Sequence, residues 1–277
     1  MNLDIFDVEH GACALVTTSN GKRLLIDCGH NGRTSWSPGA SLVASGIHTI
    51  DRLFVTNFDE DHASGYPDLY SKINIRVLVT NPTVRADTVM HLKTEDGMGV
   101  GIESLVLSMK NFFTGGPPDI EDFGDTSFSV YYNAYGTPPH GFDDENNLSL
   151  VVFLSCGGHK IVFPGDLEKA GWRNLIQNHL FANELRGVTL FVASHHGRDS
   201  GYCEEVMRLC PNIQAVIISD KKHGFQTQDT VGTYRKHARG FIYDGGERRV
   251  LTTRRDKSMS LSISADGTAT IALGLTA

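Results

Sequence analysis

The sequence lacks any hydrophobic stretch suited to a membrane span, and it lacks an excess of basic residues. No run of about 18 apolar residues occurs in the 277 residues, so we expect no transmembrane helix and no membrane partner. The start, MNLDIFDVEH, has acidic residues where a secretory signal has a basic segment and an apolar run. The net charge of −7 and the pI of about 5.9 argue against binding of long duplex nucleic acid through phosphates, although a carboxylate cluster that holds cations would also contribute to this charge.

Cysteine is scarce, and its pattern disfavours two kinds of cross-link. The five cysteines are an odd number, and no two of them are spaced as CxxC. A disulfide framework and a zinc site of cysteine type are therefore not expected. Free thiols in a reducing cytosol, several of them buried, are expected instead, and they favour a cytoplasmic location. The cysteines are Cys13, Cys28, Cys156, Cys203 and Cys210.

The sequence also lacks internal repeats, low-complexity tracts and a linker rich in Pro or Ser. Its length is sufficient to bury a sizeable core, and its content of 40% hydrophobic and 21% charged residues is ordinary for a globular protein. We expect a single domain over residues 1–277.

Short apolar runs separated by Gly and Asn turns predict strands in the first part of the chain. Helical spacing of apolar residues predicts a helix at 100–113, and strands and helices alternate after it. The expected strands are 3–8, 12–17, 23–27, 53–56, 76–80, 128–132, 148–155, 160–163, 190–193, 215–219, 240–243, 249–253 and 260–264. The other expected helices are one with Leu167 to His179 on one face, one at 204–209 and one at 230–238. This order predicts an α+β protein whose sheet-on-sheet core is covered by helices.

The most informative segment follows the strand expected at 53–56. Within six residues the chain places Asn57, Asp59, Glu60, Asp61 and His62. Carboxylates this close together repel one another and raise one another's pKa unless a positive charge lies among them. Asp oxygens and a His nitrogen suit zinc or manganese, so the segment predicts a divalent cation; a solvated acidic turn is the alternative.

Three later strand ends also deliver Asp or His to a loop. Asp166 follows the strand expected at 160–163, where it could equally cap a helix. His195 and His196 follow the strand expected at 190–193. Residues 220–223, DKKH, follow the strand expected at 215–219, and an ordinary surface loop is the alternative there. Because strand ends on one edge of a sheet form a shared rim, we expect these loops to converge.

These segments together resemble the metallo-β-lactamase superfamily, whose strand-end motif is HxHxDH, and more narrowly the metallo-hydrolase domain of ComEC-like proteins. The resemblance covers roughly residues 3–240. It implies an αββα sandwich in which two mixed β-sheets are flanked by helices. The segments that carry it are FDVEHGACALV (6–16), LLIDCG (24–29), NFDEDHASG (57–65), Asn147-Leu148-Ser149, Gly165-Asp166, Ser194 to Gly197 and Lys222-His223-Gly224.

The resemblance implies two divalent ions, manganese or zinc, and a role for each matching residue. Asp59 would bind the first ion, Asp61 and His62 would bind the second, and Asp166 would bridge the two. His196, or His195, would complete the second site, and Asp27 would orient a ligand. Asp61, His195 and His223 would form the catalytic group, and Asn57, Asn147, Lys222 and His223 would contact the substrate.

One position departs from the family pattern. Asn57 stands where the family has the first His of its motif, and an amide is a weaker ligand for zinc or manganese. Either the first ion is bound loosely, or another group such as His140 or Asn147 completes its site. A site with one tight ion, or a silent relative, is the further alternative.

ComEC-like relatives are associated with phosphodiester cleavage, so the resemblance implies a metal-dependent phosphodiesterase or nuclease acting on nucleic acid or a nucleotide. A hydrolase of a lactam, lactone or thioester is one alternative, since loops 114–126 and 133–147 could build an apolar pocket. The other is a non-catalytic binding module in an operon-encoded multi-protein system. Phosphates would be held by basic residues that otherwise form a solvated surface: Arg198, Lys221, Lys222, Arg235 and Lys236.

Overall fold

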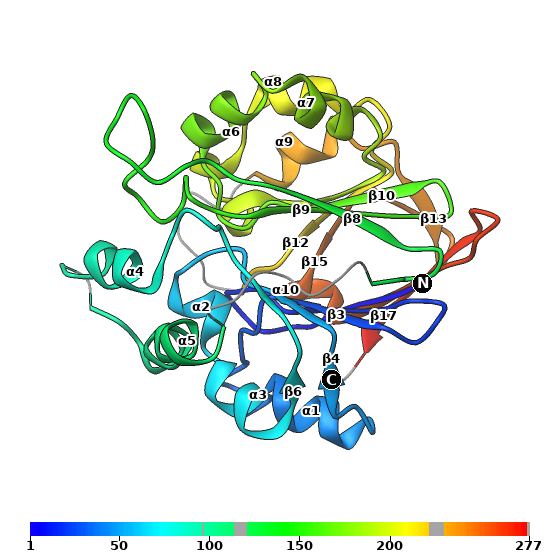
Figure 1. Ribbon diagram of the computed structural model, residues 1–277. Coiled ribbons are helices and arrows are strands. Elements are labelled where there is room, and N and C mark those ends of the chain that lie inside the picture. The colour runs from blue at the N-terminus through cyan, green and yellow to red at the C-terminus, as the bar shows by residue number, and fades with distance from the viewer. Residues whose placement is uncertain (96, 114–120, 222–229, 276–277) are drawn as a thin grey trace.

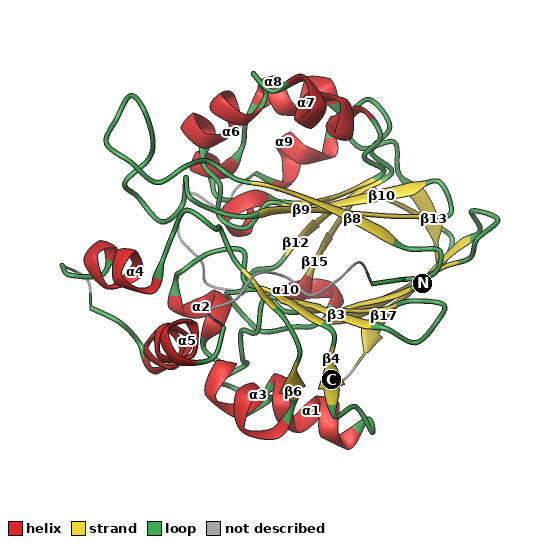
Figure 2. Cartoon of the chain, in the orientation of Figure 1, coloured by secondary structure: helices red, strands yellow, loops and turns green. Residues whose placement is uncertain are grey.

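Two β-sheets lie face to face in the computed structural model, with helices on both outer faces (Figures 1 and 2). The structure describes residues 1–95, 97–113, 121–221 and 230–275. Helices α6 to α9 lie over one sheet, and α1, α3 and α5 lie beneath the other (Figure 2). The expected αββα sandwich of the α+β class is therefore confirmed.

The first sheet joins the two ends of the described chain. Its strand order is β17-β16-β1-β2-β3-β5-β7, with antiparallel pairing from β17 to β3 and parallel pairing from β3 to β7. The strands are β1 (Asn2–Ile5), β2 (Ala14–Thr17), β3 (Arg23–Ile26), β5 (Arg52–Phe54), β7 (Leu78–Val79), β16 (Ser258–Ile263) and β17 (Ala269–Leu275). Because β3 and β5 are parallel, both end at the same edge, and Asp27 and Asn57 follow them there.

The second sheet places its strand ends in the same way. Its order is β15-β12-β11-β10-β9-β8, and β9 and β10 form an antiparallel hairpin. Strands β10, β11, β12 and β15 are parallel, so they end at one edge. The strands are β8 (Ser127–Tyr131), β9 (Val151–Cys156), β10 (His159–Phe163), β11 (Leu190–Val192), β12 (Ala215–Ile218) and β15 (Val250–Thr252).

The helices and the small sheets complete the described chain. The helices are α1 (Pro38–Ala44), α2 (Glu60–Ala63), α3 (Tyr66–Lys72), α4 (Ala86–Leu92), α5 (Val100–Asn111), α6 (Lys169–Leu175), α7 (His179–Arg186), α8 (Glu204–Leu209), α9 (Val231–Arg235) and α10 (Thr253–Asp256). Two-stranded sheets pair β4 (Thr49–Ile50) with β6 (Asn74–Ile75), and β13 (Phe241–Tyr243) with β14 (Gly246–Arg248). None of the helices in the described residues is long and apolar enough to cross a membrane.

The apolar core forms three layers, one between the sheets and one under each set of helices. Strand β3 shows how the sequence builds them, because successive side chains of a strand point to opposite faces. Leu24 and Ile26 pack between the sheets, whereas Leu25 packs under the helices of the first sheet. Burial on both faces explains why these strands are continuous apolar runs rather than alternating ones.

Two helix predictions had different outcomes. The apolar spacing at 100–113 is that of α5, whose Ile102 and Leu105 are buried against the first sheet. The single helix expected from Leu167 to His179 is wrong, because the chain forms α6 and then α7. The first helix ends at Leu175, and Asn178 caps the second, since its side chain accepts a hydrogen bond of 3.0 Å from the Leu180 backbone N–H.

Candidate metal centre

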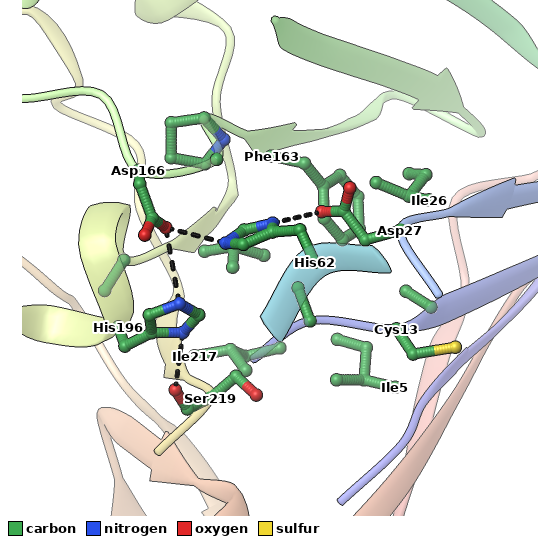
Figure 3. A pocket seen from close by; sticks show the side chains of 16 residues that line it. Ile5, Cys13, Ile26, Asp27, His62, Phe163, Asp166, His196, Ile217 and Ser219 are labelled. Carbon is green, nitrogen blue, oxygen red and sulfur yellow. Dashed lines mark hydrogen bonds and ion pairs between the residues drawn. The ribbon is translucent and has the colours of Figure 1, made fainter. Parts of the chain in front are cut away.

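Four side chains from three strand ends meet in one buried cluster, which we call the Asp61–His196 cluster: Asp61, His62, Asp166 and His196. His62 Nε2 lies 2.9 Å from Asp166 Oδ1. His196 Nε2 lies 3.3 Å from both Asp61 Oδ2 and Asp166 Oδ1. Figure 3 shows the Asp166 carboxylate between the two imidazoles. The convergence expected of these loops is therefore observed for β5, β10 and β11.

A glycine near the N-terminus holds the α2 segment in place. Gly11 has φ of +134°, and a Cβ atom at this position would lie 2.3 Å from the Asp61 carbonyl oxygen. Only glycine permits this backbone and this close approach. The neighbouring backbone also fixes the segment, because the Cys28 N–H donates to the His62 carbonyl over 2.9 Å.

The two adjacent histidines have strained backbone. His195 and His196 have φ of 51° and 52°, and Gly197 continues the left-handed run at 75°. Left-handed conformation costs a residue with a side chain about 1–3 kcal/mol and is most often kept at functional sites. The His195 N–H donates to the Gly165 carbonyl over 3.1 Å, which ties this turn to the loop that carries Asp166.

Both imidazoles of the cluster are oriented by a hydrogen bond on their other nitrogen. His62 Nδ1 lies 2.9 Å from Asp27 Oδ2, and Asp27 is fixed by the Thr56 N–H and hydroxyl at 2.7 and 2.5 Å. His196 Nδ1 lies 3.0 Å from the Ser219 carbonyl, which can only accept. His196 therefore carries its proton on Nδ1 when neutral, and Nε2 presents a lone pair to the carboxylates. This is the usual arrangement of metal-binding histidines.

The charges within the cluster shift the pKa values of its side chains toward their charged forms. Burial alone would raise the pKa of Asp166, but the nearby His196 and His62 hold it well below its usual range. Burial opposes a charged His196, yet Asp166 and Asp61 raise its pKa to about 10. The pKa of His62 is raised by Asp166 and Asp27, again against burial. In the protein alone, protons on the imidazoles thus balance the carboxylates.

The residues of the cluster fit a divalent cation. Within the described part of the chain, His196 Nε2 is buried and has no hydrogen-bond partner, although two carboxylate oxygens lie near it. The possible ligand atoms of the cluster and of the neighbouring His10 form two groups, each with its atoms within 4.8 Å of one another: His62-Asp166-His196 and His10-Asp61-His196. Two imidazoles and two carboxylates suit zinc or manganese.

His10 is a member of the site that sequence reasoning missed. Its Nε2 lies 3.8 Å from Asp61 Oδ2, and its ring centroid lies 4.3 Å from that of His196. Burial and the neighbouring His196 lower the pKa of His10 to about 4, so its ring is neutral at neutral pH. A signal was present, because His10 follows the strand expected at 3–8, and β1 ends at the same edge as β3.

The other half of the segment 57–62 turns to different partners. Asn57 Oδ1 accepts the Asp59 N–H over 2.6 Å, and its Nδ2 donates to Ser149 Oγ over 3.1 Å. Asp59 Oδ1 forms an ion pair with Lys93, whose Nζ also lies 2.9 Å from Glu145 Oε1. Burial opposes the charge of Lys93, but Asp59 and Glu145 raise its pKa, so it stays cationic.

Glu60 in the same segment has a structural partner. Its carboxylate accepts the backbone N–H groups of Gly101 and Ile102 at 2.8 and 3.1 Å, which caps the start of α5. The segment therefore divides its side chains between the Asp61–His196 cluster, Lys93 and this helix end.

The remaining predicted residues are not members of the cluster. His195 Nδ1 lies 3.1 Å from Glu168 Oε1, and its Nε2 lies 2.9 Å from Arg198 Nη1 and 3.7 Å from Asp166 Oδ2. Asn147 Oδ1 accepts the Gly171 N–H over 2.7 Å, which ties its loop to α6. His140 is exposed. Lys222 and His223 lie outside the described residues.

A cavity of about 40 Å³ lies between the sheets beside the cluster (Figure 3). Asp27, His62, Asp166 and His196 line its polar end, and apolar side chains of both sheets line the rest. A volume of this size holds a few water molecules and no substrate. His10, Asp61 and Arg198 do not line this cavity.

Comparison with known proteins agrees with this geometry. The metallo-beta-lactamase superfamily matches residues 6–173, which is more than half of the chain. ComE operon protein 3 of Bacillus subtilis (strain 168) is 25% identical over 245 residues, covering 80% of this chain but only 29% of that relative. The structure of a CmlA beta-hydroxylase mutant has a TM-score of 0.50 at 10% identity, covering 94% of this chain and 54% of that one.

A diphosphatase of the PhnP family has a TM-score of 0.43 at 13% identity, covering 99% of this chain and 98% of that one. The match of the family over residues 6–173 agrees with the observed sandwich and with the Asp and His side chains at its strand ends. The chain belongs to the metallo-β-lactamase superfamily of metal-dependent hydrolases.

Proposed function

We propose that this protein is a metal-dependent phosphodiesterase or nuclease that acts on nucleic acid or a nucleotide. The observation that carries the proposal is the place of Arg198 beside the cluster. Its guanidinium lies 3.2 Å from His10 Nε2 and 2.9 Å from His195 Nε2. These two imidazoles in turn lie 3.8 Å from Asp61 Oδ2 and 3.7 Å from Asp166 Oδ2. Arginine stays cationic at all relevant pH values and matches phosphate oxygens with two donors, whereas a lactam or thioester offers no such anion.

The cation of this site would be held by Asp61, His62, Asp166 and His196. When bound, it supplies Lewis-acid chemistry that activates water and polarises a substrate oxygen. Asp27 and the Ser219 carbonyl keep the two imidazoles in the orientation that binding needs. Zinc and manganese are the two ions that this ligand set suits.

The substrate side would be formed by His10, His195 and Arg198. In our proposal Arg198 binds a phosphate oxygen, and His195 is held by Glu168 and Ser200. His195 gives a proton to the leaving oxygen as its bond to phosphorus breaks and regains one from the attacking water. Lys222 and His223 keep their predicted role as further phosphate contacts. The resemblance to ComEC-like proteins favours the same substrate class.

A substrate panel tests this function. Purified protein loaded with Mn²⁺ or Zn²⁺ is assayed on bis-p-nitrophenyl phosphate and on a chromogenic lactam, and we expect turnover of the phosphodiester. Arg198→Met should lower kcat/KM on the phosphodiester roughly tenfold to hundredfold, since one charge-assisted contact is lost. Arg173→Met is the matched control, because Arg173 is exposed on α6 and pairs with Glu205. Hydrolysis of the lactam alone would contradict the proposal.

One observation favours a second candidate, a non-catalytic binding module in an operon-encoded protein system. Asp59, the ligand implied for the first ion, contacts Lys93 instead of the cluster. Asn57, which stands where the family has a His, contacts Ser149. The name of the relative, ComE operon protein 3, agrees with an operon setting. Metal analysis separates the candidates. Less than about 0.2 ion per chain after growth with manganese or zinc, together with no turnover, would favour the module.

A further inference from the structure

Lys93 is a buried cation beside Asp59, the carboxylate that the resemblance implies as a ligand of the first metal ion. It follows α4 directly and is 9% exposed. Its ammonium contacts two carboxylates, those of Asp59 and Glu145. A buried ammonium with one partner would be costly, but two carboxylates compensate the loss of water. This arrangement matches the first ion's position in the resemblance, since Asp59 is the carboxylate implied as its ligand.

Asn57 is turned so that its amide oxygen faces the Asp59 N–H and its amide nitrogen faces Ser149. Its amide oxygen already accepts the Asp59 N–H over 2.6 Å. Its amide nitrogen donates to Ser149 Oγ over 3.1 Å and faces the Glu145 carbonyl at 3.3 Å. An amide nitrogen of this kind has no lone pair for a cation. Because Asn57 is fully buried, both bonds are shielded from competing water.

Ser149 joins the two halves of the site. Its hydroxyl oxygen accepts both from Asn57 Nδ2 and from the Asp166 backbone N–H, each over 3.1 Å. The orientation of Asn57 is therefore fixed by the same loop that presents Asp166 to the cluster. Rotation of the Asn57 amide toward a cation would leave the Asp59 N–H and the Ser149 hydroxyl without these partners.

We infer that this chain binds one divalent cation, at the Asp61–His196 cluster, and that the Lys93 ammonium takes the place of the second cation of a two-metal centre. The inference rests on the metal centre of the proposed function. One bound cation is thus inferred in place of the two that the resemblance implies. The ammonium balances Asp59 and Glu145 but is no Lewis acid, and a chelator cannot remove it.

Metal stoichiometry tests the inference. Wild-type protein incubated with excess Mn²⁺ and freed of unbound ion should carry about one ion per chain by elemental analysis. Asn57→His alone should also carry about one, because Lys93 still occupies Asp59. The double variant Asn57→His/Lys93→Ala should carry about two, since a histidine and a released carboxylate then provide the first site.

Three outcomes overturn the inference. Two ions per wild-type chain would contradict it while leaving the metal centre intact, and no ion at all would contradict the metal centre as well. A folded double variant that still binds one ion would contradict the role of Lys93. Should the double variant fail to fold, the EPR spectrum of Mn²⁺ in the wild type decides: resolved hyperfine lines of an isolated ion are expected, and the spectrum of a spin-coupled pair would refute the inference.

Discussion

The two halves of the segment 57–62 lie in one short loop and behave differently. Asp61 and His62 point to Asp166 and His196, which come from the ends of β10 and β11. Asp59 points to Lys93, which lies 34 residues later in the chain and carries its own positive charge. At Asp61 and His62, histidines and carboxylates surround a space that a cation could fill. At Asp59, the Lys93 ammonium lies between the carboxylates instead.

The difference indicates that residues far away in the sequence determine whether the carboxylates of such a motif can bind a metal ion. Both halves have carboxylates that need a cation. Imidazoles can give up a proton and become ligands, so the Asp61–His196 cluster can exchange its protons for a metal ion. Lys93 keeps its proton because its pKa is raised by Asp59 and Glu145. In our proposal one half is therefore the binding site, and the other is a fixed ion pair.

The largest effect is expected at Asp166, which contacts both imidazoles of the cluster. Asp166→Asn should abolish tight metal binding and lower kcat/KM on a phosphodiester by about a thousandfold or more, equal to about 4 kcal/mol. Elemental analysis and kinetics measure the two effects. Asp199→Asn is the matched control, since Asp199 is an exposed partner of Lys169. Full metal content in Asp166→Asn would remove the distinction between the two halves.

A smaller effect is expected at Asp27, which orients His62 without facing the shared space. Asp27→Asn keeps the size of the side chain but removes the charge that holds His62 Nδ1. Loss of such an orienting group typically weakens metal affinity by roughly 10–100-fold. Competition with a chromogenic chelator measures this affinity. An unchanged affinity would show that the His62 ring is held by packing alone.

The third comparison is between Asp59→Asn and Asp61→Asn, which make the same change on the two sides of the loop. Asp61→Asn should reduce metal content, whereas Asp59→Asn should leave it unchanged and lower turnover by less than about tenfold. Asp59→Asn should also lower the free energy of unfolding by about 1–2 kcal/mol, because Lys93 keeps only Glu145 as partner and Asp59 is partly exposed. Urea denaturation measures the stability. Equal loss of metal in both variants would contradict the single-ion inference.

Sequence patterns were sufficient for the parts of the site that depend on strand ends. Asp166 and His196 follow apolar runs that are parallel strands, and parallel strands end at one edge. The sandwich followed from the same runs and from the resemblance. The short helices α1 and α3 were missed because Pro and Gly at their starts are also typical of turns. The single domain over 1–277 and the cytoplasmic location stay predictions.

Lys93 could not be predicted, and the reason is physical. It lies 34 residues after Asp59 in a stretch without strong periodicity, and its partner depends on how α4 packs against the loop. His10 differs from Lys93, because it follows β1, and β1 ends at the same edge as β3. Side chains brought together by packing alone leave no spacing signal in the sequence.

The smallest effect is expected at Asp51, whose ion cluster contains no histidine and serves as a reference for both halves. Its carboxylate contacts Lys22 Nζ and Arg76 Nη1, each at 3.1 Å, and accepts the Arg23 N–H at 2.9 Å. Burial alone would raise the pKa of Asp51, but the Arg23 N–H and Lys22 outweigh it and lower the pKa. A carboxyl with a lowered pKa in the folded state stabilises the protein above its unfolded pKa of about 3.9, and this contribution is lost as the pH falls through the folded value.

Asp51→Asn should therefore lower the free energy of unfolding by about 1 kcal/mol or less at neutral pH, because its cationic partners are partly exposed. The difference from the wild type should shrink below about pH 4. Urea denaturation at neutral and acidic pH measures it, and metal content and turnover should stay unchanged. If Asp51→Asn lost metal as Asp61→Asn is expected to, an ion cluster without histidine would affect the ion as strongly as the ligands do. The contrast between the halves of the 57–62 loop would then reflect global stability rather than local ligand chemistry.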